Sequence, residues 1–95
     1  MTFEQFKSSL QDDAPPDDVS LALQAMWHDA NGHWDQAHNA AQEQDDATGA
    51  WVHAYLHRVE GDEFNAGYWY RRANKPHAKT SLAEEWDEIV VALCS

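Results

Sequence analysis

Apolar residues recur every three or four positions along most of this chain, which is the spacing of one face of an α-helix. No stretch alternates apolar and polar residues as a half-buried strand does. The pattern predicts an N-terminal helix within 1–13, a helical hairpin over 17–44, a second hairpin over 46–74 and a C-terminal capping helix over 81–94. We therefore expect an all-α fold of about six helices in a single compact domain.

Short polar residues indicate where the predicted helices begin. Thr2-x-x-Gln5 and Ser81-x-x-Glu84 have the form of capping boxes, in which two side chains satisfy backbone groups at a helix start. Acidic residues suit the positive end of a helix dipole and can act as N-caps. On this basis we expect helix starts at Asp17 and Asp18, at Asp45 and Asp46, and after an N-cap at Asp62.

The helix predicted after Asp46 is apolar on two sides. Trp51 and Tyr55 lie on one face, and Val52 and Leu56 lie on another. A helix of this kind is usually packed between neighbours, so we expect it at the centre of the fold.

A pattern in the first hairpin occurs again in the second. Ala25-x-x-His28-x-x-x-Gly32-x-x-x-x-Ala37 recurs 29 residues later as Ala54-x-x-His57-x-x-x-Gly61-x-x-x-x-Ala66. Repetition over this length is typical of helix-pair repeat architectures. Each hairpin is expected to turn at its glycine, and the small alanines allow the two helices to approach closely.

The second hairpin has features of a known superfamily. Gly61 closes its first helix, Ala66 lies five residues further on, and Tyr70 and Ala73 follow at helical spacing. This arrangement resembles the tetratricopeptide superfamily, and the segment 65–73 is similar to the Sel-like branch, whose second helix often reads Ala-x-x-Trp-Tyr-x-x-Ala. The stretch from Trp51 to Ala73 also resembles small bacterial proteins of unassigned function.

The first hairpin departs from this family pattern. Ala41 stands where an aromatic residue is usual, and Gln44 stands where a small residue is usual. The 29-residue period is also shorter than the roughly 34 residues of the tetratricopeptide repeat. The resemblance implies a scaffold that binds other proteins or peptides and is not an enzyme, with the outer helices capping a short array.

Composition limits the classes of partner. In 95 residues, 17 Asp and Glu against six Lys and Arg give a formal charge of −11, which argues against nucleic acid and anionic membranes. The charge is compatible with a basic protein or peptide. The chain has five Trp, three Tyr and three Phe. Because a chain of 95 residues has little surface with which to cover them, we expect some of these rings to stay exposed. We therefore expect an apolar patch on the end helices that pairs with a second copy, as a homodimer, or with a partner helix.

Nothing in the sequence suggests export or insertion into a membrane. No stretch approaches the roughly 20 apolar residues that a membrane span needs. The first residues, Met1–Lys7, lack the basic-then-apolar pattern of a signal peptide, and Cys94 is the single cysteine, so no intramolecular disulfide can form. These features predict a cytoplasmic protein, and no cofactor is expected.

A polar stripe runs along the fourth predicted helix: Asp46, Gly49, His53, His57 and Glu60. His53 and His57 are one turn apart and could hold one metal ion, with Glu60 as a third ligand. The motif lacks the Glu directly after the first His that metalloproteases use as a base. We therefore favour a solvated polar face without metal. The alternatives are a hydrogen bond from His57 to Asn65 or Glu60, and metal binding.

The densest mixture of charged and aromatic residues is the candidate binding surface: His57, Arg58, Glu60, Asp62, Asn65, Tyr68, Trp69 and Arg72. Arginine beside tryptophan or tyrosine, with carboxylates nearby, is typical of interaction hot spots. The alternative is an intramolecular network that holds the Gly61 turn. No nucleophile motif or phosphate-binding loop is present, so no catalytic residue is assigned. The sequence predicts a protein- or peptide-interaction module, with small-molecule or metal binding by the histidine-rich helix as the alternative.

Overall fold

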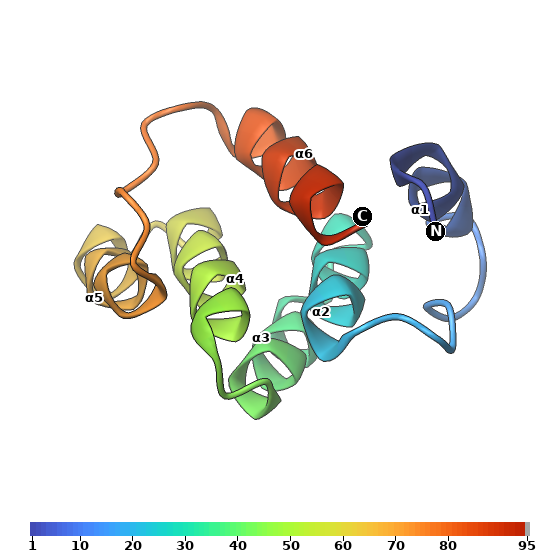
Figure 1. Ribbon diagram of the computed structural model, residues 1–95, viewed down its shortest axis with the longest axis horizontal. Coiled ribbons are helices and arrows are strands. Elements are labelled where there is room, and N and C mark those ends of the chain that lie inside the picture. The colour runs from blue at the N-terminus through green and yellow to red at the C-terminus, as the bar shows by residue number, and fades with distance from the viewer. Residues whose placement is uncertain (95) are drawn as a thin grey trace.

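The computed structural model describes residues 1–94, which form six α-helices without any strand (Figure 1). The helices are α1 (Phe3–Ser9), α2 (Leu21–Ala30), α3 (Trp34–Glu43), α4 (Ala47–Val59), α5 (Glu63–Ala73) and α6 (Leu82–Leu93). Because the described residues form helices and no strand, the all-α prediction is confirmed. The helices form one compact unit of 33 × 22 × 22 Å. None of the helices within residues 1–94 combines the length and the apolar character that crossing a bilayer requires.

The two predicted hairpins, α2–α3 and α4–α5, turn in the same way. Gly32 and Gly61 have φ angles of +78° and +86°, a conformation that a Cβ atom disfavours. In each turn, the residue after the glycine donates its backbone N–H to the carbonyl of His28 or His57, at 2.9 Å in both cases. These are the bonds of a Schellman motif. The sequence repeat is therefore also a repeat of backbone geometry.

Most helix starts lie where the sequence predicts them. Thr2 and Ser81 both form complete capping boxes. The carboxylate of Asp46 accepts a hydrogen bond from the Gly49 backbone N–H at 2.8 Å. Side-chain caps of this kind satisfy backbone donors that have no partner inside the helix.

The start of α2 differs from the prediction. Its N-cap is Ser20, whose hydroxyl accepts a hydrogen bond from the Leu23 backbone N–H at 3.2 Å. Asp17 and Asp18 lie in an exposed turn that precedes the helix. A carboxylate outside the first turn cannot reach the unpaired N–H groups of the helix, whereas Ser20 can, and this local bond sets the boundary.

The long helix α4 lies at the centre of the fold, in agreement with its two apolar sides. It packs against four other helices, α2, α3, α5 and α6. Figure 1 shows α5 at one end of the molecule and α1 at the other. The main packing partner of α5 is α4, so the opposite face of α5 is open.

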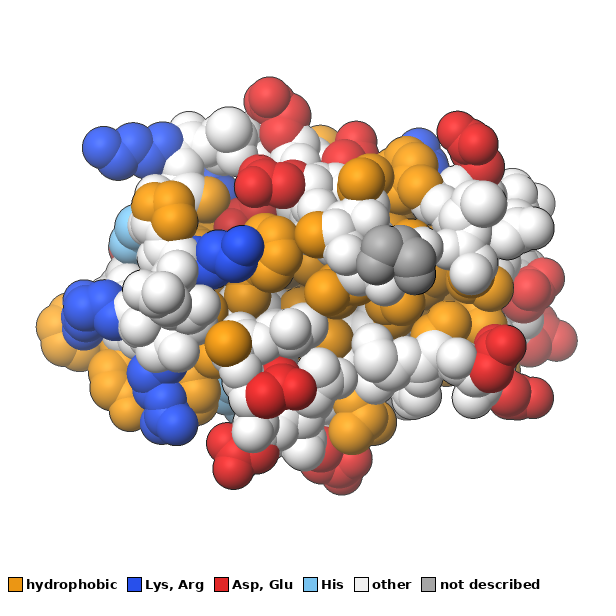
Figure 2. Space-filling view, in the orientation of Figure 1, with side chains coloured by type: hydrophobic (Ala, Val, Ile, Leu, Met, Phe, Trp, Pro, Cys, Tyr) orange, Lys and Arg blue, Asp and Glu red, His pale blue; other side chains and the backbone are white. Residues whose placement is uncertain are grey.

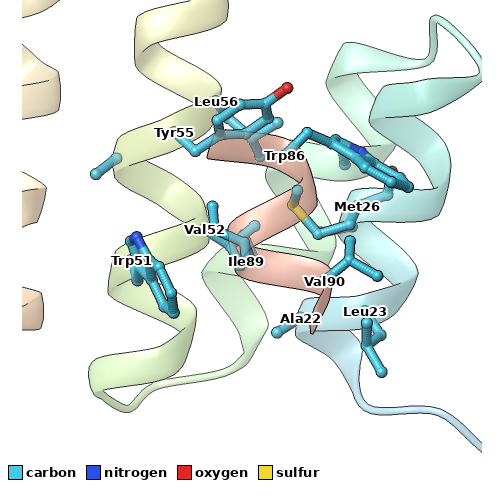
Figure 3. Packing of buried hydrophobic residues seen from close by; sticks show 14 of the residues in the cluster. Ala22, Leu23, Met26, Trp51, Val52, Tyr55, Leu56, Trp86, Ile89 and Val90 are labelled. Carbon is cyan, nitrogen blue, oxygen red and sulfur yellow. The ribbon is translucent and has the colours of Figure 1, made fainter. Parts of the chain in front are cut away.

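The core joins α2, α4 and α6 (Figure 3). Ile89 of α6 packs among Val52 and Leu56 of α4 and Met26 of α2, and all four are fully buried. Full burial of side chains of this size stabilises a fold by about 1.5–3 kcal/mol each. The core is therefore aliphatic at its centre.

Tryptophan rings surround this centre and tie helices together through their N–H groups. The Nε1 atom of Trp27 donates to the Ser9 carbonyl at 2.9 Å, and that of Trp86 donates to the Met26 carbonyl at 3.2 Å. Trp34 likewise donates to the Leu56 carbonyl at 2.9 Å. Each bond joins two different helices or a helix and the end of its neighbour.

The end helices cover one another more fully than the sequence suggests. Phe3 and Phe6 of α1 lie over Trp86 of α6, with ring centroids 6.4 and 6.1 Å from it, and Trp86 is buried. Val91 on α6 stays 54% exposed, but the most exposed large apolar side chain is Phe64 of α5, at 87%. The largest uncovered ring is thus on the second hairpin.

Candidate functional site

The structure separates the predicted binding surface into four groups with different surroundings. Arg58 points toward α6, and Asp62 and Asn65 cap the start of α5. Tyr68, Trp69 and Arg72 lie together on α5. The remaining two, His57 and Glu60, belong to a cluster of histidines and carboxylates between the helices.

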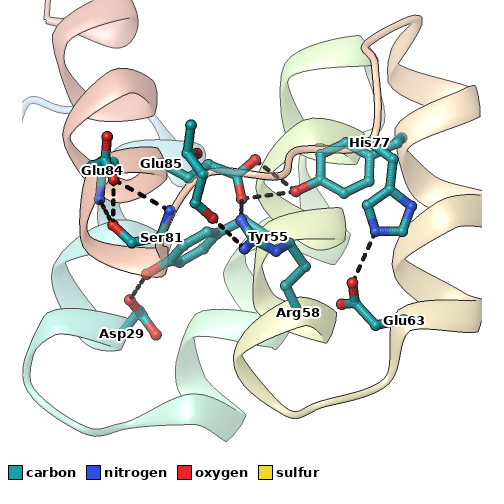
Figure 4. Close-up of polar contacts among 10 residues, drawn as sticks. Asp29, Tyr55, Arg58, Glu63, His77, Ser81, Glu84 and Glu85 are labelled. Carbon is teal, nitrogen blue, oxygen red and sulfur yellow. Dashed lines mark hydrogen bonds and ion pairs between the residues drawn. The ribbon is translucent and has the colours of Figure 1, made fainter.

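Arg58 belongs to a polar network that joins α4, α5 and α6 through hydrogen bonds and an ion pair (Figure 4). Its guanidinium donates to Glu85 at 2.6 Å and to the Thr80 carbonyl at 2.6 Å. Glu85 is only 1% exposed, and the Tyr70 hydroxyl donates to its carboxylate at 2.6 Å. Burial, followed by the neighbouring Glu85 carboxylate, raises the pKa of Tyr70 above its usual range. Arg58 is therefore a structural residue and not part of an open binding surface.

The group at the Gly61 turn forms a local cap. Asp62 accepts a hydrogen bond from the Asn65 backbone N–H at 3.1 Å and another from the Asn65 side chain at 2.6 Å. These bonds lower the pKa of Asp62. The predicted hydrogen bond from His57 to Asn65 or Glu60 is absent: the buried Nδ1 atom of His57 makes no hydrogen bond, and Glu60 Oε1 lies 3.5 Å from it.

Three histidine rings meet between α3 and α4, and we call them the histidine cluster: His38, His53 and His57. The ring of His38 lies 4.4 Å from that of His53 and 5.5 Å from that of His57, measured between centroids. His53 and His57 are themselves 5.0 Å apart and nearly parallel. The prediction of a solvated polar stripe is wrong here, because His53 is only 4% exposed.

Two tryptophans hold the cluster from outside. Trp34 stacks on His38 with centroids 4.8 Å apart, and Trp69 stacks on His53 at 3.8 Å with an interplanar angle of 10°. Flat rings in contact exclude water from the faces of the imidazoles. The orientation of the two histidines is therefore set by their packing.

The electrostatics of the cluster favour the neutral forms of His38 and His53. Burial, followed by the charges of His38 and His57, lowers the pKa of His53 from 6.5 to about 4. The pKa of His38 is lowered as well, again by burial first and by His57 second. A neutral ring offers a lone pair on one nitrogen, which is the form that binds metal ions.

Gly49 belongs to the same predicted polar stripe of α4 as His53, and it too is buried. It lies where the start of α4 approaches the end of α3. A Cβ atom at this position would overlap the backbone carbonyl of Gln44. The close approach also brings the start of α4 beside a cavity of about 320 Å³, whose lining includes His53, Trp69 and Arg72. This cavity connects one side of the histidine cluster with solvent.

The outer face of α5 carries an aromatic and basic surface. Phe64 is 87% exposed and Tyr68 is 43% exposed, one turn apart. The Arg72 guanidinium lies over both neighbouring rings, 5.9 Å from the Tyr68 centroid and 5.1 Å from that of Trp69. We call Phe64, Tyr68, Trp69 and Arg72 the α5 surface.

Sequence reasoning missed three residues that matter here. Glu85 was overlooked because it follows Glu84 and looks like a second solvent-facing acid, although it shares the inward face of α6 with Ile89. The position of His38, one turn after Trp34 on α3, could have suggested a ring that faces the next hairpin. The exposure of Phe64 could not be predicted, since exposure of a single ring depends on which helices cover it.

Known proteins provide no further guide to this site. Comparisons of the chain with models of protein families, with curated proteins and with solved structures found no match. The resemblance of the second hairpin to tetratricopeptide repeats therefore remains a prediction from the sequence.

Proposed function

We propose that this protein is a non-catalytic interaction module that binds an acidic segment of a partner protein along the α5 surface. The observation that carries the proposal is the exposure of Phe64, which leaves 87% of a phenylalanine side chain in water beside Tyr68 and Arg72. Aromatic residues and arginine are the types most enriched at interaction hot spots. Covering this ring would remove a large apolar area from water.

Charge indicates the kind of partner. Four of the six basic residues of the chain lie within 71–79, at the end of α5 and in the loop after it. Figure 2 shows most of the visible Lys and Arg side chains gathered at one end of the molecule, while acidic side chains are spread over much of the remaining visible face. A local positive field on a chain of net charge −11 favours an acidic segment at this end and repels it elsewhere. The basic partner that the net charge suggested is thus replaced, for this surface, by an acidic one.

The α5 surface is also held in place before any partner arrives. Trp69 is stacked on His53, and the Arg72 guanidinium lies over the Trp69 ring. Side chains whose conformations are already fixed lose little entropy on binding, which favours affinity. The two hairpins with matching turns support a helix-pair repeat scaffold, as the tetratricopeptide resemblance implies. We further propose the cytoplasm as its location, since the sequence has one cysteine.

Selection of displayed random peptides against the purified protein tests this proposal. We expect the selected sequences to be rich in Asp and Glu together with apolar residues, and to bind less well as salt is raised. Replacing Phe64→Ser or Arg72→Glu should weaken binding of a selected peptide by about tenfold or more. The matched control is Val91→Ser, which removes an apolar side chain that is 54% exposed on α6 and should leave affinity unchanged. Selection of peptides without acidic residues, or equal losses in all three variants, would contradict the proposal.

A further inference from the structure

We propose that the histidine cluster is a binding site for one divalent transition-metal ion of the zinc type, with His38, His53 and His57 as its three protein ligands. The site borders the interaction surface proposed above, because Trp69 contacts both, but its three ligands are not part of that surface. It also differs from the metal site considered from the sequence, because the third ligand comes from α3 and not from Glu60.

The positions of the ring nitrogens support this assignment. One nitrogen from each of the three rings lies within 4.8 Å of the other two. Tetrahedral zinc with metal–nitrogen bonds of 2.0–2.1 Å needs ligand nitrogens about 3.3 Å apart. The most distant pair therefore has to approach by about 1.5 Å at most, which small rotations of the side chains provide. Three histidines leave the fourth position of the ion open to water.

Two helices bring these ligands together. His53 and His57 are at i and i+4 of α4, so both project from the same face of the helix. His38 reaches them from α3, and the stacking of Trp34 on its ring fixes its direction. A ligand set on packed helices is held more precisely than one on loops.

Nε2 of His57 is the atom assigned to the ion, because the other ring nitrogen of His57 has the surroundings of one that supports a metal ligand. Its Nδ1 atom is buried without a hydrogen-bond partner, although Glu60 Oε1 lies only 3.5 Å away and Asp62 Oδ2 lies 4.0 Å away. Metal-binding histidines usually donate their second ring N–H to a carboxylate, which fixes the tautomer and leaves the other nitrogen for the ion. A small rotation on metal binding would complete the bond to Glu60. Glu60 is thereby reassigned from ligand to ligand support.

The cluster is also accessible and of suitable chemistry. Imidazole nitrogen is a preferred ligand of zinc, copper and nickel. The cavity of about 320 Å³ lined by His53 provides a path from solvent. The rings of Trp34 and Trp69 stack on His38 and His53, and apolar surroundings of this kind strengthen the attraction between ion and ligand.

Zinc titration of the chelator-treated protein tests the site. We expect one zinc ion per chain with a dissociation constant below about 1 μM and a rise in the melting temperature. His38→Gln should weaken binding by about 100-fold or more, and Glu60→Gln by about 10-fold. His33→Gln is the matched control, since it removes an exposed histidine at the start of the same helix and should leave zinc affinity unchanged.

Cobalt(II) provides a readout that does not depend on whether a variant folds. Bound to the unaltered protein, it should give the intense visible absorption of a tetrahedral site, and added zinc should remove that absorption. Zinc binding that survives His38→Gln in a folded variant, or that is lost equally in His33→Gln, would overturn the assignment. Absence of a tetrahedral cobalt spectrum from the unaltered protein would overturn it as well.

Discussion

At Gly49 a single hydrogen atom determines how closely two helices approach. The start of α4 lies against the backbone at the end of α3, and an added Cβ would overlap the carbonyl oxygen of Gln44. Backbone atoms cannot move aside as a flexible side chain can, so the helices themselves would have to shift. This position therefore requires glycine for space and not for its backbone angles.

We expect Gly49→Ala to lower the free energy of unfolding by about 1–3 kcal/mol or more, as overpacking of a close contact does. Gly67→Ala is the control, because it also places alanine inside a helix but its Cβ would meet only side-chain atoms at ordinary distances, His77 at 3.5 Å and Arg71 at 3.6 Å. Alanine is favoured over glycine in helices by about 1 kcal/mol, so the control should be neutral or stabilising. Urea unfolding of both variants measures the difference. Similar effects at the two positions would show that the close approach of α3 and α4 is wrong.

At the scale of a helix, the start of α2 separates two interpretations of the same sequence. The hydroxyl of Ser20 satisfies the Leu23 N–H, while Asp17 lies in the preceding turn. Ser20→Ala should cost about 0.5–2 kcal/mol of stability, the usual effect of losing an N-cap. Asp17→Ala should change stability by less than about 0.5 kcal/mol, as for most exposed positions. Thermal melting of both variants checks this, and a larger loss from Asp17→Ala would place the helix start where the acidic pair suggested.

Features that depend on neighbours along the chain were predictable from the sequence. The turn at Gly61 and the caps at Asp46 and Ser81 each involve atoms a few residues apart, and their positions agree with the structure. The periodicity of apolar residues likewise placed α4 at the centre, because a helix buried on two sides must be apolar on both.

The parts of the site that were missed depend on contacts between distant residues. Arg58 and Glu85 are 27 residues apart, and neither shows its buried partner in the local sequence. His38 and His53 meet only because the two hairpins pack in one particular way. The sequence does not show that α3 and α5 cover the histidines of α4. For this reason His53 was expected to face solvent, although it is buried.

At the scale of the whole molecule, the buried histidines make stability depend on pH. The pKa values of His28, His38 and His53 are all lowered, in each case mainly by burial. Below pH 6.5 the unfolded chain takes up protons on these rings, while folded His53 stays neutral until about pH 4. The contribution of His53 to stability is therefore complete above about pH 6.5 and is lost as the pH falls toward 4. His28 and His38 act in the same direction.

For the metal-free protein, kept so with a chelator, we expect the contribution of His53 to lower the free energy of unfolding between pH 6.5 and pH 5 by up to about 1.4 kcal/mol per pH unit. This window is diagnostic, because protonation of the 17 Asp and Glu relieves the repulsion of a −11 charge only at lower pH, near about 4. His53→Phe keeps an aromatic ring against Trp69 but removes one titrating group, so its stability should depend less steeply on pH. Urea unfolding at several pH values measures both slopes. If the two proteins lose stability in parallel as the pH falls, His53 is already able to take up a proton in the folded state, and its burial between α4 and Trp69 is incorrect.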